Sequence, residues 1–272
     1  MARNDHPGPD SLQGEKMIEA KANGVTFLAG RPVARPEAPT VVFLHGSGLA
    51  AAFWQRQLDD LSARINTVAV DLPGHGRSDP PALESVPQYA AAVMAFIRAC
   101  GFARPLPCGL SLGGAIALQM LLDFPAELVG GILIGTGARL RVRPEIFDRI
   151  NQDYPGFVAL SGSVAASPAT PAGTLASVEA LTAACPPAVT AADYRACDRF
   201  DVMDRLAEID RPVLVICGAD DQLTPVKYSD YLVRHIDRAQ RCIVPRAGHL
   251  VPVEQPAAVN DAIRRFVARH LA

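Results

Sequence analysis

A serine stands between two glycines at the junction of two apolar segments, and this arrangement constrains the fold more than any other feature. The segment Gly109-Leu110-Ser111-Leu112-Gly113 follows an apolar run at 105–108 and precedes a helix-like run at 114–122. We therefore expect a nucleophile elbow, in which a strand, a sharp turn and a helix raise the Ser111 hydroxyl above a sheet. Glycines suit such a turn because residues without a Cβ let the neighbouring backbone pass closely. A serine flanked by glycines also arises by chance, so the interpretation depends on the rest of the chain.

Three further apolar runs lead into residues that a reactive serine needs. One leads into His45-Gly46-Ser47-Gly48, a loop suited to presenting a backbone N–H. A second leads into two adjacent carboxylates, Asp220 and Asp221, and a third leads to His249. The chain order Ser, Asp, His differs from the orders His-Asp-Ser and Asp-His-Ser of the two other common serine triads.

With these segments in place, the chain resembles the α/β-hydrolases, in particular the small esterases, lactonases and haloperoxidase-like enzymes. The resemblance covers about residues 40–135 and 205–270, and several motifs in one order make it far more specific than the elbow alone. It implies a mainly parallel eight-stranded sheet with helices on both faces, and a helical cap. Beyond the elbow, the matching motifs are Phe43-Leu44-His45-Gly46, Asp71-Leu72-Pro73-Gly74-His75-Gly76-Arg77-Ser78-Asp79, and Gly248-His249 with Glu254-Gln255-Pro256.

The apolar pattern by itself also indicates an α/β fold. Runs rich in Val, Ile and Leu alternate with helix-like segments, which indicates strands buried on both faces of a mainly parallel sheet. Asn23-Gly24 between two strand-like runs predicts a hairpin, so the sheet should start antiparallel at one edge. Apolar residues at helical intervals from Pro256 to Leu271 predict a closing amphipathic helix. The expected strands beyond the hairpin are 41–44, 67–70, 106–108, 131–134, 213–217 and 241–244.

We expect a core formed by 17–137 and 206–272, a helical cap inserted at 138–205, and a disordered tail at 1–16. The tail is polar and lacks the apolar core of a secretory signal. The insertion is too long for a simple crossover, and the resemblance implies that it covers the active site. Within it, the tract of small residues at 161–174 is either a mobile hinge of the lid or a plain surface loop.

The expected chemistry depends on three side chains. Ser111 is the expected nucleophile, and the alternative is a small residue that lets a strand pack closely on a helix. His249 is the expected general base, because a neutral imidazole can take the hydroxyl proton and return it to the leaving group. The resemblance places the triad carboxylate at Asp221, four residues before Pro225. Asp220 remains the rival, because only one of two adjacent side chains can point at the imidazole.

Backbone N–H groups of Ser47 and Leu112 are expected to form an oxyanion hole, since two preorganised donors match the charge that develops on an acyl oxygen. The apolar residues of the cap favour a medium-length aliphatic or aromatic acyl group. The side chains expected to contact the substrate are Leu49, Phe147, Phe157 and Leu250.

Other polar residues have simpler interpretations. His45 and His75 lie in loops whose role in the resembled family is structural. The sequence contains neither a phosphate loop nor a zinc-protease motif, and a Gly-Thr-Gly after the strand at 131–134 lacks the third glycine of a dinucleotide fingerprint. We therefore expect no cofactor and no metal. Three acidic residues near the end of the cap are interpreted as solvated or helix-capping: Asp198, Asp201 and Asp204.

Composition limits the partners. A net charge of −2 without a basic stripe argues against nucleic acid and membrane surfaces, so the expected partner is a small molecule without strong charge. The 6 cysteines show no metal-like clustering and are interpreted as reduced thiols, which predicts a cytoplasmic protein. A homo-oligomer is left open.

The function expected from the sequence is hydrolysis of a small carboxylic ester or lactone through an acyl-enzyme. Two alternatives use the same triad, a C–C bond hydrolase and an acyltransferase. The third is a non-catalytic ligand-binding relative, because a fold alone does not establish activity.

Overall fold

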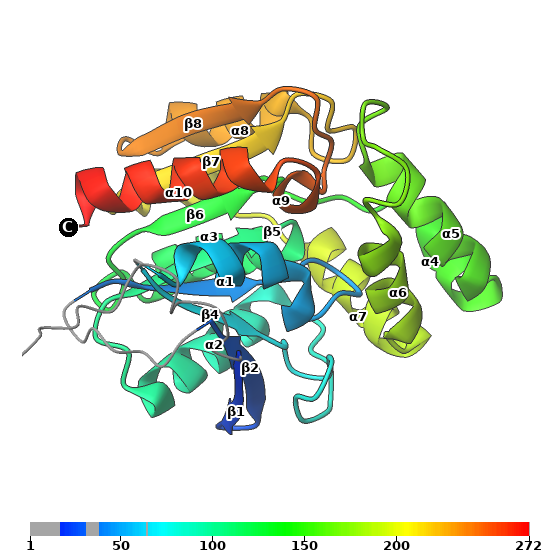
Figure 1. Ribbon diagram of the computed structural model, residues 1–272, viewed down its shortest axis with the longest axis horizontal. Helices are drawn as coiled ribbons and strands as arrows, with labels where there is room; N and C mark the ends of the chain where they lie inside the picture. Colours follow the sequence, from blue (N-terminus) through cyan, green and yellow to red (C-terminus); the bar gives the residue numbers. More distant parts are fainter. Residues whose placement is uncertain (1–16, 31–37, 64, 272) are drawn as a thin grey trace, which may run out of the picture.

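Eight strands form one sheet in the order β1-β2-β4-β3-β5-β6-β7-β8 (Figure 1). The structure is a computed structural model that describes residues 17–30, 38–63 and 65–271, so the tail expected at 1–16 lies outside the described residues. All six strands expected beyond the hairpin are present within one or two residues of their expected bounds. The strands are β1 Ile18–Ala22, β2 Val25–Ala29, β3 Thr40–Leu44, β4 Asn66–Val70, β5 Pro105–Leu110, β6 Gly131–Ile134, β7 Val213–Gly218 and β8 Ala239–Val244.

The predicted hairpin is confirmed at one edge of the sheet. β1 and β2 pair antiparallel through a turn in which Asn23 and Gly24 have φ of 47° and 77°. Positive φ at both central residues is the requirement of the hairpin turn that Asn-Gly favours. β2 pairs antiparallel with β4, and every later pairing, from β4 to β8, is parallel.

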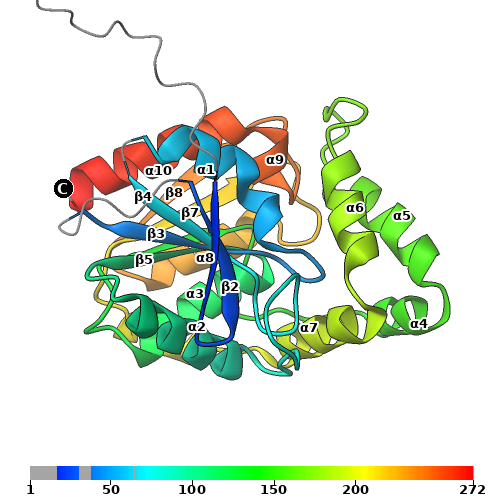
Figure 2. The ribbon, with the colours of Figure 1, turned by 60° about the horizontal axis from the view of Figure 1, so that its bottom comes forward.

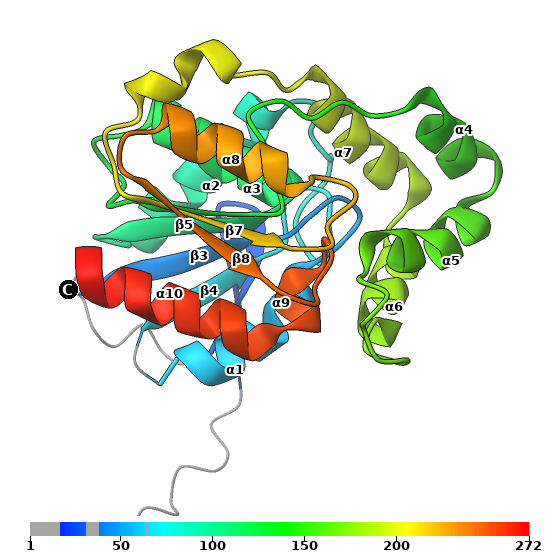
Figure 3. The same ribbon diagram turned by 90° about the horizontal axis from the view of Figure 1, so that it is seen from above.

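Helices cover both faces of the sheet (Figures 1 and 3). The central strand β3 is buried along its whole length, so its alternating side chains serve two cores. Val42 and Leu44 belong to the core on one face, whereas Val41 and Phe43 belong to the other, where Trp54 stacks on Phe43. One face carries α2 Val86–Cys100, α3 Leu112–Asp123 and α8 Val226–His235, and the other carries α1 Gln55–Leu61, α9 Val251–Glu254 and α10 Pro256–His270.

Between β6 and β7 the chain forms four α-helices, followed by a short 3₁₀ helix at Met203–Glu208. We call the four α-helices the helical insert: α4 Pro144–Gln152, α5 Tyr154–Ala165, α6 Ala176–Ala184 and α7 Pro187–Arg199. Figures 2 and 3 show the insert to one side of the core, beyond the carboxyl ends of the parallel strands. It has a small apolar cluster of its own around Ile150, Phe157 and Ala191. No described helix is long and apolar enough to cross a membrane.

The tract of small residues at 161–174 is only partly a connection. Its first five residues continue α5 to Ala165, and turns follow from 167 onward. Small side chains here permit close contact between α5 and α6, because a Cβ added at Gly162 would lie 3.1 Å from the Glu179 side chain. A plain surface loop, one of the two alternatives for this tract, is therefore wrong for 161–165.

Candidate active site

Ser111 occupies a strained turn between β5 and α3. Its φ of 54° and ψ of −113° lie in a backbone region that residues with a Cβ rarely adopt. Three hydrogen bonds hold the backbone there: Ser111 N–H donates to the Ile134 carbonyl at 2.9 Å, and the Ser111 carbonyl accepts from Thr136 Oγ1 and from Ala115 N–H. The surrounding structure thus fixes a backbone conformation that a serine would rarely adopt by itself.

The glycines of the elbow are required by close backbone approach. A Cβ added at Gly109 would lie 2.0 Å from the Gly113 carbonyl, and one at Gly113 would lie 2.2 Å from the Leu44 carbonyl oxygen. Because backbone atoms cannot move aside as a flexible side chain can, any other residue would push α3 away from β5 and β3.

The structure brings His249 and Asp221 together. His249 Nδ1 lies 2.9 Å from Asp221 Oδ2, and both side chains are almost completely buried. Asp221 Oδ1 also accepts from the N–H groups of Leu223 and Thr224, and Oδ2 accepts from the Thr224 hydroxyl. Burial by itself raises the pKa of Asp221, but the charge and hydrogen bond of His249, with the donors of Thr224, lower it below its ordinary value.

Asp220 points elsewhere. Its carboxylate accepts from the hydroxyl of Ser167, in the connection between α5 and α6. Of the two adjacent carboxylates, only Asp221 therefore contacts the imidazole. Across 17–30, 38–63 and 65–271, no group of three or more His, Cys, Asp or Glu side chains is arranged to hold a metal ion.

The loop that carries His249 is tied to the helical insert. His249 N–H donates to the Ala165 carbonyl at the end of α5. The buried carboxylate of Glu254 accepts from Gly248 N–H at 3.0 Å and from Ser167 N–H at 2.8 Å. One core side chain therefore holds both the His249 loop and the first residues of the insert's connection.

The 45–49 loop after β3 lies against the elbow. A Cβ added at Gly46 would be 3.6 Å from the Ser111 Cβ. Within the described part of the chain, neither Ser47 N–H nor Leu112 N–H donates a hydrogen bond to another residue. Both N–H groups remain available to an oxygen bound beside Ser111.

The orientation of Ser47 N–H follows from that of the Gly46 carbonyl, which belongs to the same peptide group. The Gly46 carbonyl accepts from His45 Nδ1 at 2.8 Å and from Leu49 N–H at 3.2 Å. In a trans peptide the N–H points opposite to the C=O, so Ser47 N–H points away from these two donors. His45 Nε2 accepts from Leu72 N–H, which leaves the proton on Nδ1. Burial, and next the charge of His75, lower the pKa of His45 well below its ordinary value, so the ring is neutral.

The four expected substrate contacts divide into two groups. Leu49 and Leu250 are buried in one apolar cluster, together with Ala165 of the insert. Phe157 lies in the insert's own cluster, stacked on the Tyr154 ring, and Phe147 is half-buried on α4. The structure therefore does not bring the two phenylalanines together with the two leucines.

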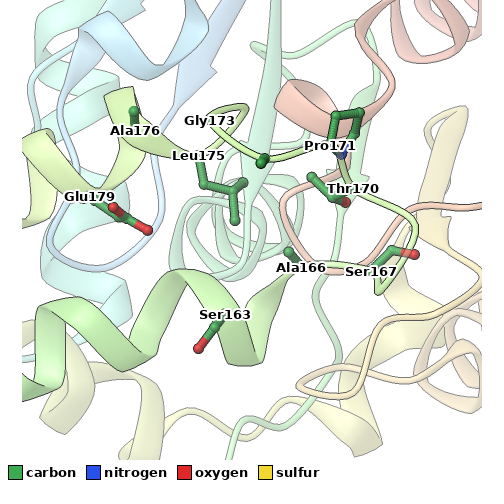
Figure 4. A pocket seen from close by; sticks show the side chains of 10 residues that line it. Ser163, Ala166, Ser167, Thr170, Pro171, Gly173, Leu175, Ala176 and Glu179 are labelled. Atoms are coloured by element: carbon green, nitrogen blue, oxygen red, sulfur yellow. The ribbon is translucent and has the colours of Figure 1, made fainter.

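A cavity of about 270 Å³ lies within the insert, between the end of α5, the connection and α6 (Figure 4). Its walls include Ser163, Leu175 and Glu179, but none of Ser111, Asp221 and His249. A second cavity, of about 300 Å³, lies beside α8 and is lined by Arg139, Tyr228 and neighbouring residues. Neither cavity adjoins Ser111 directly.

The sequence did not indicate a role for one buried acid, Asp193. Asp193 on α7 is fully buried, whereas the three acids singled out nearby interact at the surface or with backbone. Its only sequence signal is its helical spacing from Thr190 and Cys197, which also face the core. Nothing in composition distinguishes it from the other acids of the insert.

Comparison with known proteins agrees with this geometry. The model of the Alpha/beta hydrolase family matches residues 41–262. The chain is 26% identical to a pimeloyl-[acyl-carrier protein] methyl ester esterase of Nitrosomonas europaea, over 78% of this chain and 88% of that protein. It is 26% identical to 3-oxoadipate enol-lactonase 2 of Acinetobacter baylyi, over 85% and 89%. It is 30% identical to the putative carbamate hydrolase RutD of Caulobacter vibrioides, over 93% and 98%.

Among solved structures, a thermophilic esterase superposes with a TM-score of 0.80 at 32% sequence identity, covering 94% of this chain and 98% of that one. The eight-stranded sheet, the elbow and the family match extend over most of the described core. The chain belongs to the alpha/beta hydrolase family.

Proposed function

We propose that this protein is a serine hydrolase that cleaves a small carboxylic ester or lactone through an acyl-enzyme. The observation that carries the proposal is the contact of 2.9 Å between Asp221 Oδ2 and His249 Nδ1, in a fold that also holds Ser111 in a strained turn after β5. An ionised carboxylate keeps a proton on Nδ1, so the lone pair of Nε2 is free to accept the Ser111 hydroxyl proton.

The reaction proceeds in two halves. Ser111 Oγ attacks the carbonyl carbon while its proton passes to His249 Nε2. The bond to the leaving oxygen then breaks, and the imidazolium returns the proton to the departing alcohol. A water attacks the acyl-enzyme with the same proton transfers, which releases the acid and restores Ser111. With a lactone, the acid and the alcohol leave as one hydroxy acid.

The oxyanion of each tetrahedral intermediate lies against Ser47 N–H and Leu112 N–H. Leu112 is the first residue of α3, so the positive end of the helix dipole adds to its N–H. Each such donor contributes about 3 kcal/mol to stabilising the transition state. Because both groups belong to the backbone, substituting their side chains would leave them in place.

The relatives support ester or lactone cleavage as the chemistry, since two of them are named as an esterase and an enol-lactonase. The carbamate hydrolase name adds a carbamate to the substrates worth testing. We further propose that residues 138–205 form a cap over the site, and the contact of His249 N–H with the Ala165 carbonyl supports it.

The test is hydrolysis of p-nitrophenyl esters of increasing acyl length, with a lactone and an aryl carbamate in the same panel. Ser111→Ala should reduce kcat by about 10⁴-fold or more, because only the oxyanion hole and binding then remain. Ser85→Ala, at a serine bonded to Gln88 on α2, is the matched control and should keep full activity. Activity that survives in Ser111→Ala would contradict the proposal.

The same panel separates the alternatives. An acyltransferase would form a new ester when a competing alcohol is added, and a C–C hydrolase would release a carbon fragment in place of an alcohol. A non-catalytic relative would return its ligand unchanged from both the wild-type protein and Ser111→Ala. The expected optimum lies at a medium acyl length, and a preference for acetyl esters would contradict the expected pocket.

A further inference from the structure

A single carboxylate of the helical insert reaches into the core and binds three of its segments. Asp193 on α7 has no exposed surface. Its Oδ2 accepts from Gly48 N–H at 2.8 Å and lies 2.8 Å from His75 Nε2, while Oδ1 accepts from the Tyr89 hydroxyl at 2.9 Å. The partners come from the 45–49 loop, the loop after β4, and α2. Such a fully bonded carboxylate holds its neighbours in one arrangement.

The hydrogen bonds of His75 define its charge. Its Nδ1 faces the Pro73 carbonyl at 3.1 Å, and its Nε2 faces Asp193. Because both partners are acceptors, both ring nitrogens carry a proton and the ring is positively charged. Burial by itself lowers the pKa of His75, but the charge of Asp193 and the hydrogen bonds to Asp193 and Pro73 raise it above its ordinary value. Asp193 is thus half of a buried ion pair that also bonds the loop.

The contact face of α7 extends beyond Asp193. A Cβ added at Gly48 would lie 3.2 Å from Thr190 Oγ1, and Ser47 Oγ lies 3.7 Å from Cys197 Sγ. Residues 190, 193 and 197 share one side of a helix, so three successive side chains of α7 lie against the 45–49 loop.

This contact fixes the peptide next to the expected oxyanion donor. Asp193 holds Gly48 N–H, and the Gly46 carbonyl is held on the other side by His45 and Leu49. The two peptide planes that meet at the Ser47 Cα are therefore both anchored, and the direction of Ser47 N–H follows from them. Only one of these anchors comes from the insert.

We propose that Asp193 is a positioning residue, which completes the oxyanion hole from the insert by holding the 45–49 loop in place. The inference rests on the proposed function, in which Ser47 N–H binds the oxyanion. The insert then acts as part of the catalytic apparatus, in addition to covering it.

The test compares a ligand that forms an oxyanion with one that does not. Ser111 Oγ bonds to the carbonyl carbon of a trifluoromethyl ketone while its proton passes to His249, which leaves a tetrahedral oxyanion, whereas the matching methyl ketone binds without addition. Asp193→Ala should raise Ki for the trifluoromethyl ketone and lower kcat by about 10- to 100-fold, somewhat less than removing an oxyanion donor outright. KM and Ki for the methyl ketone should change by less than about 3-fold, because they report ground-state binding.

Two variants separate positioning from general damage. Asp193→Asn should recover most of the lost activity, since its amide oxygen can accept from Gly48 N–H while its NH₂ group faces the Tyr89 oxygen. Tyr89→Phe removes a donor from the other oxygen and should leave both Ki values near wild type. If Asp193→Ala does not fold, Asp193→Ser, whose hydroxyl is too short to reach Gly48, takes its place with the same expectation.

An unchanged Ki for the trifluoromethyl ketone in Asp193→Ala would overturn the inference. Equal increases for the two ketones would also overturn it, because they would indicate loss of the whole pocket. Hydrogen exchange of the peptide that contains Gly48 should be faster in Asp193→Ala, and this readout needs no activity. Failure of the proposed function shows separately, as a wild-type protein whose Ser111 forms no adduct with the trifluoromethyl ketone.

Discussion

The strain at Ser111 has a measurable cost, which two inactive variants can isolate. Ser111→Ala keeps a Cβ in the conformation with φ of 54° and ψ of −113°, whereas Ser111→Gly removes it. Neither variant has a hydroxyl, so their difference in unfolding free energy reports the backbone. We expect the glycine variant to be the more stable of the two, although glycine usually destabilises a folded chain.

The size of the effect follows from two opposing contributions. A side chain held in a sparsely populated backbone region costs about 2 kcal/mol. Glycine gives the unfolded chain more freedom than alanine, which lowers the stability of Ser111→Gly by about 0.7 kcal/mol. The net expectation is that Ser111→Gly exceeds Ser111→Ala by about 1 kcal/mol, and this difference is part of what the elbow costs the fold.

Urea unfolding measures the difference directly. A gap of about 1 kcal/mol corresponds to a midpoint shift of about 0.4 M for a chain of this size. The control is the same pair of substitutions at Ser163, an exposed position inside α5, where glycine should be the less stable by about 0.5–1 kcal/mol. If Ser111→Gly were equal to or less stable than Ser111→Ala, the turn would hold no strain and the reasoning would fail.

Three further expectations concern the elbow, the triad and the buried ion pair. Gly113→Ala places a Cβ 2.2 Å from a β3 carbonyl oxygen and should cost more than about 3 kcal/mol in urea unfolding, whereas Gly101→Ala, with φ of 67° and open space around it, should cost about 1 kcal/mol. Asp221→Asn should lower kcat by about 10⁴-fold with KM nearly unchanged. Because the folded pKa of Asp221 is lowered, its carboxylate should stabilise the fold above the unfolded pKa of about 4, and this effect should disappear as pH falls through the folded pKa. The unfolding free energies of wild type and Asp221→Asn should therefore converge in acid. The pKa of His75 is raised, so the charged ring stabilises the fold most below about pH 6.5 and less as pH rises through the folded pKa. Urea unfolding across pH should therefore show the largest difference between wild type and His75→Gln below about pH 6.5.

The core was predictable because its strands are buried on both faces. β3, β4 and β7 are buried from end to end, and an uninterrupted apolar run in the sequence needs no partner to be recognised. The strand bounds were less predictable. Gly109 and Leu110 were assigned to the turn, but they pair with Leu133 and Ile134 and extend β5. β8 begins before its apolar part, because an edge strand can carry partly exposed residues such as Gln240.

The helical insert was only coarsely predictable. Its helices pack on one another through small residues, which the sequence pattern cannot tell from a loop, and α5 therefore extends into the tract at 161–174. Phe157 joins the insert's own apolar cluster, and apolar character alone does not reveal which cluster a residue joins. Its expected contact with the substrate stays a prediction. Asp193 acquires its role through contacts with residues more than a hundred positions away in sequence, which no local pattern contains.

Two buried carboxylates join the insert to two loops of the core, the 45–49 loop and the loop that carries His249. Asp193 belongs to the insert and holds the loop that carries Ser47, whereas Glu254 belongs to the core and holds Ser167 of the insert together with Gly248, beside His249. A buried carboxylate that loses its hydrogen bonds is costly, so separating the insert from the core as one rigid lid would break both sets of contacts at once. The fold therefore favours substrate access by a local motion of part of the insert, with α7 remaining docked. Such a motion leaves the proposed oxyanion donor, Ser47 N–H, in place, and the parts of the insert that are free to move are those away from the contacts of Asp193, Ala165 and Ser167 with the core.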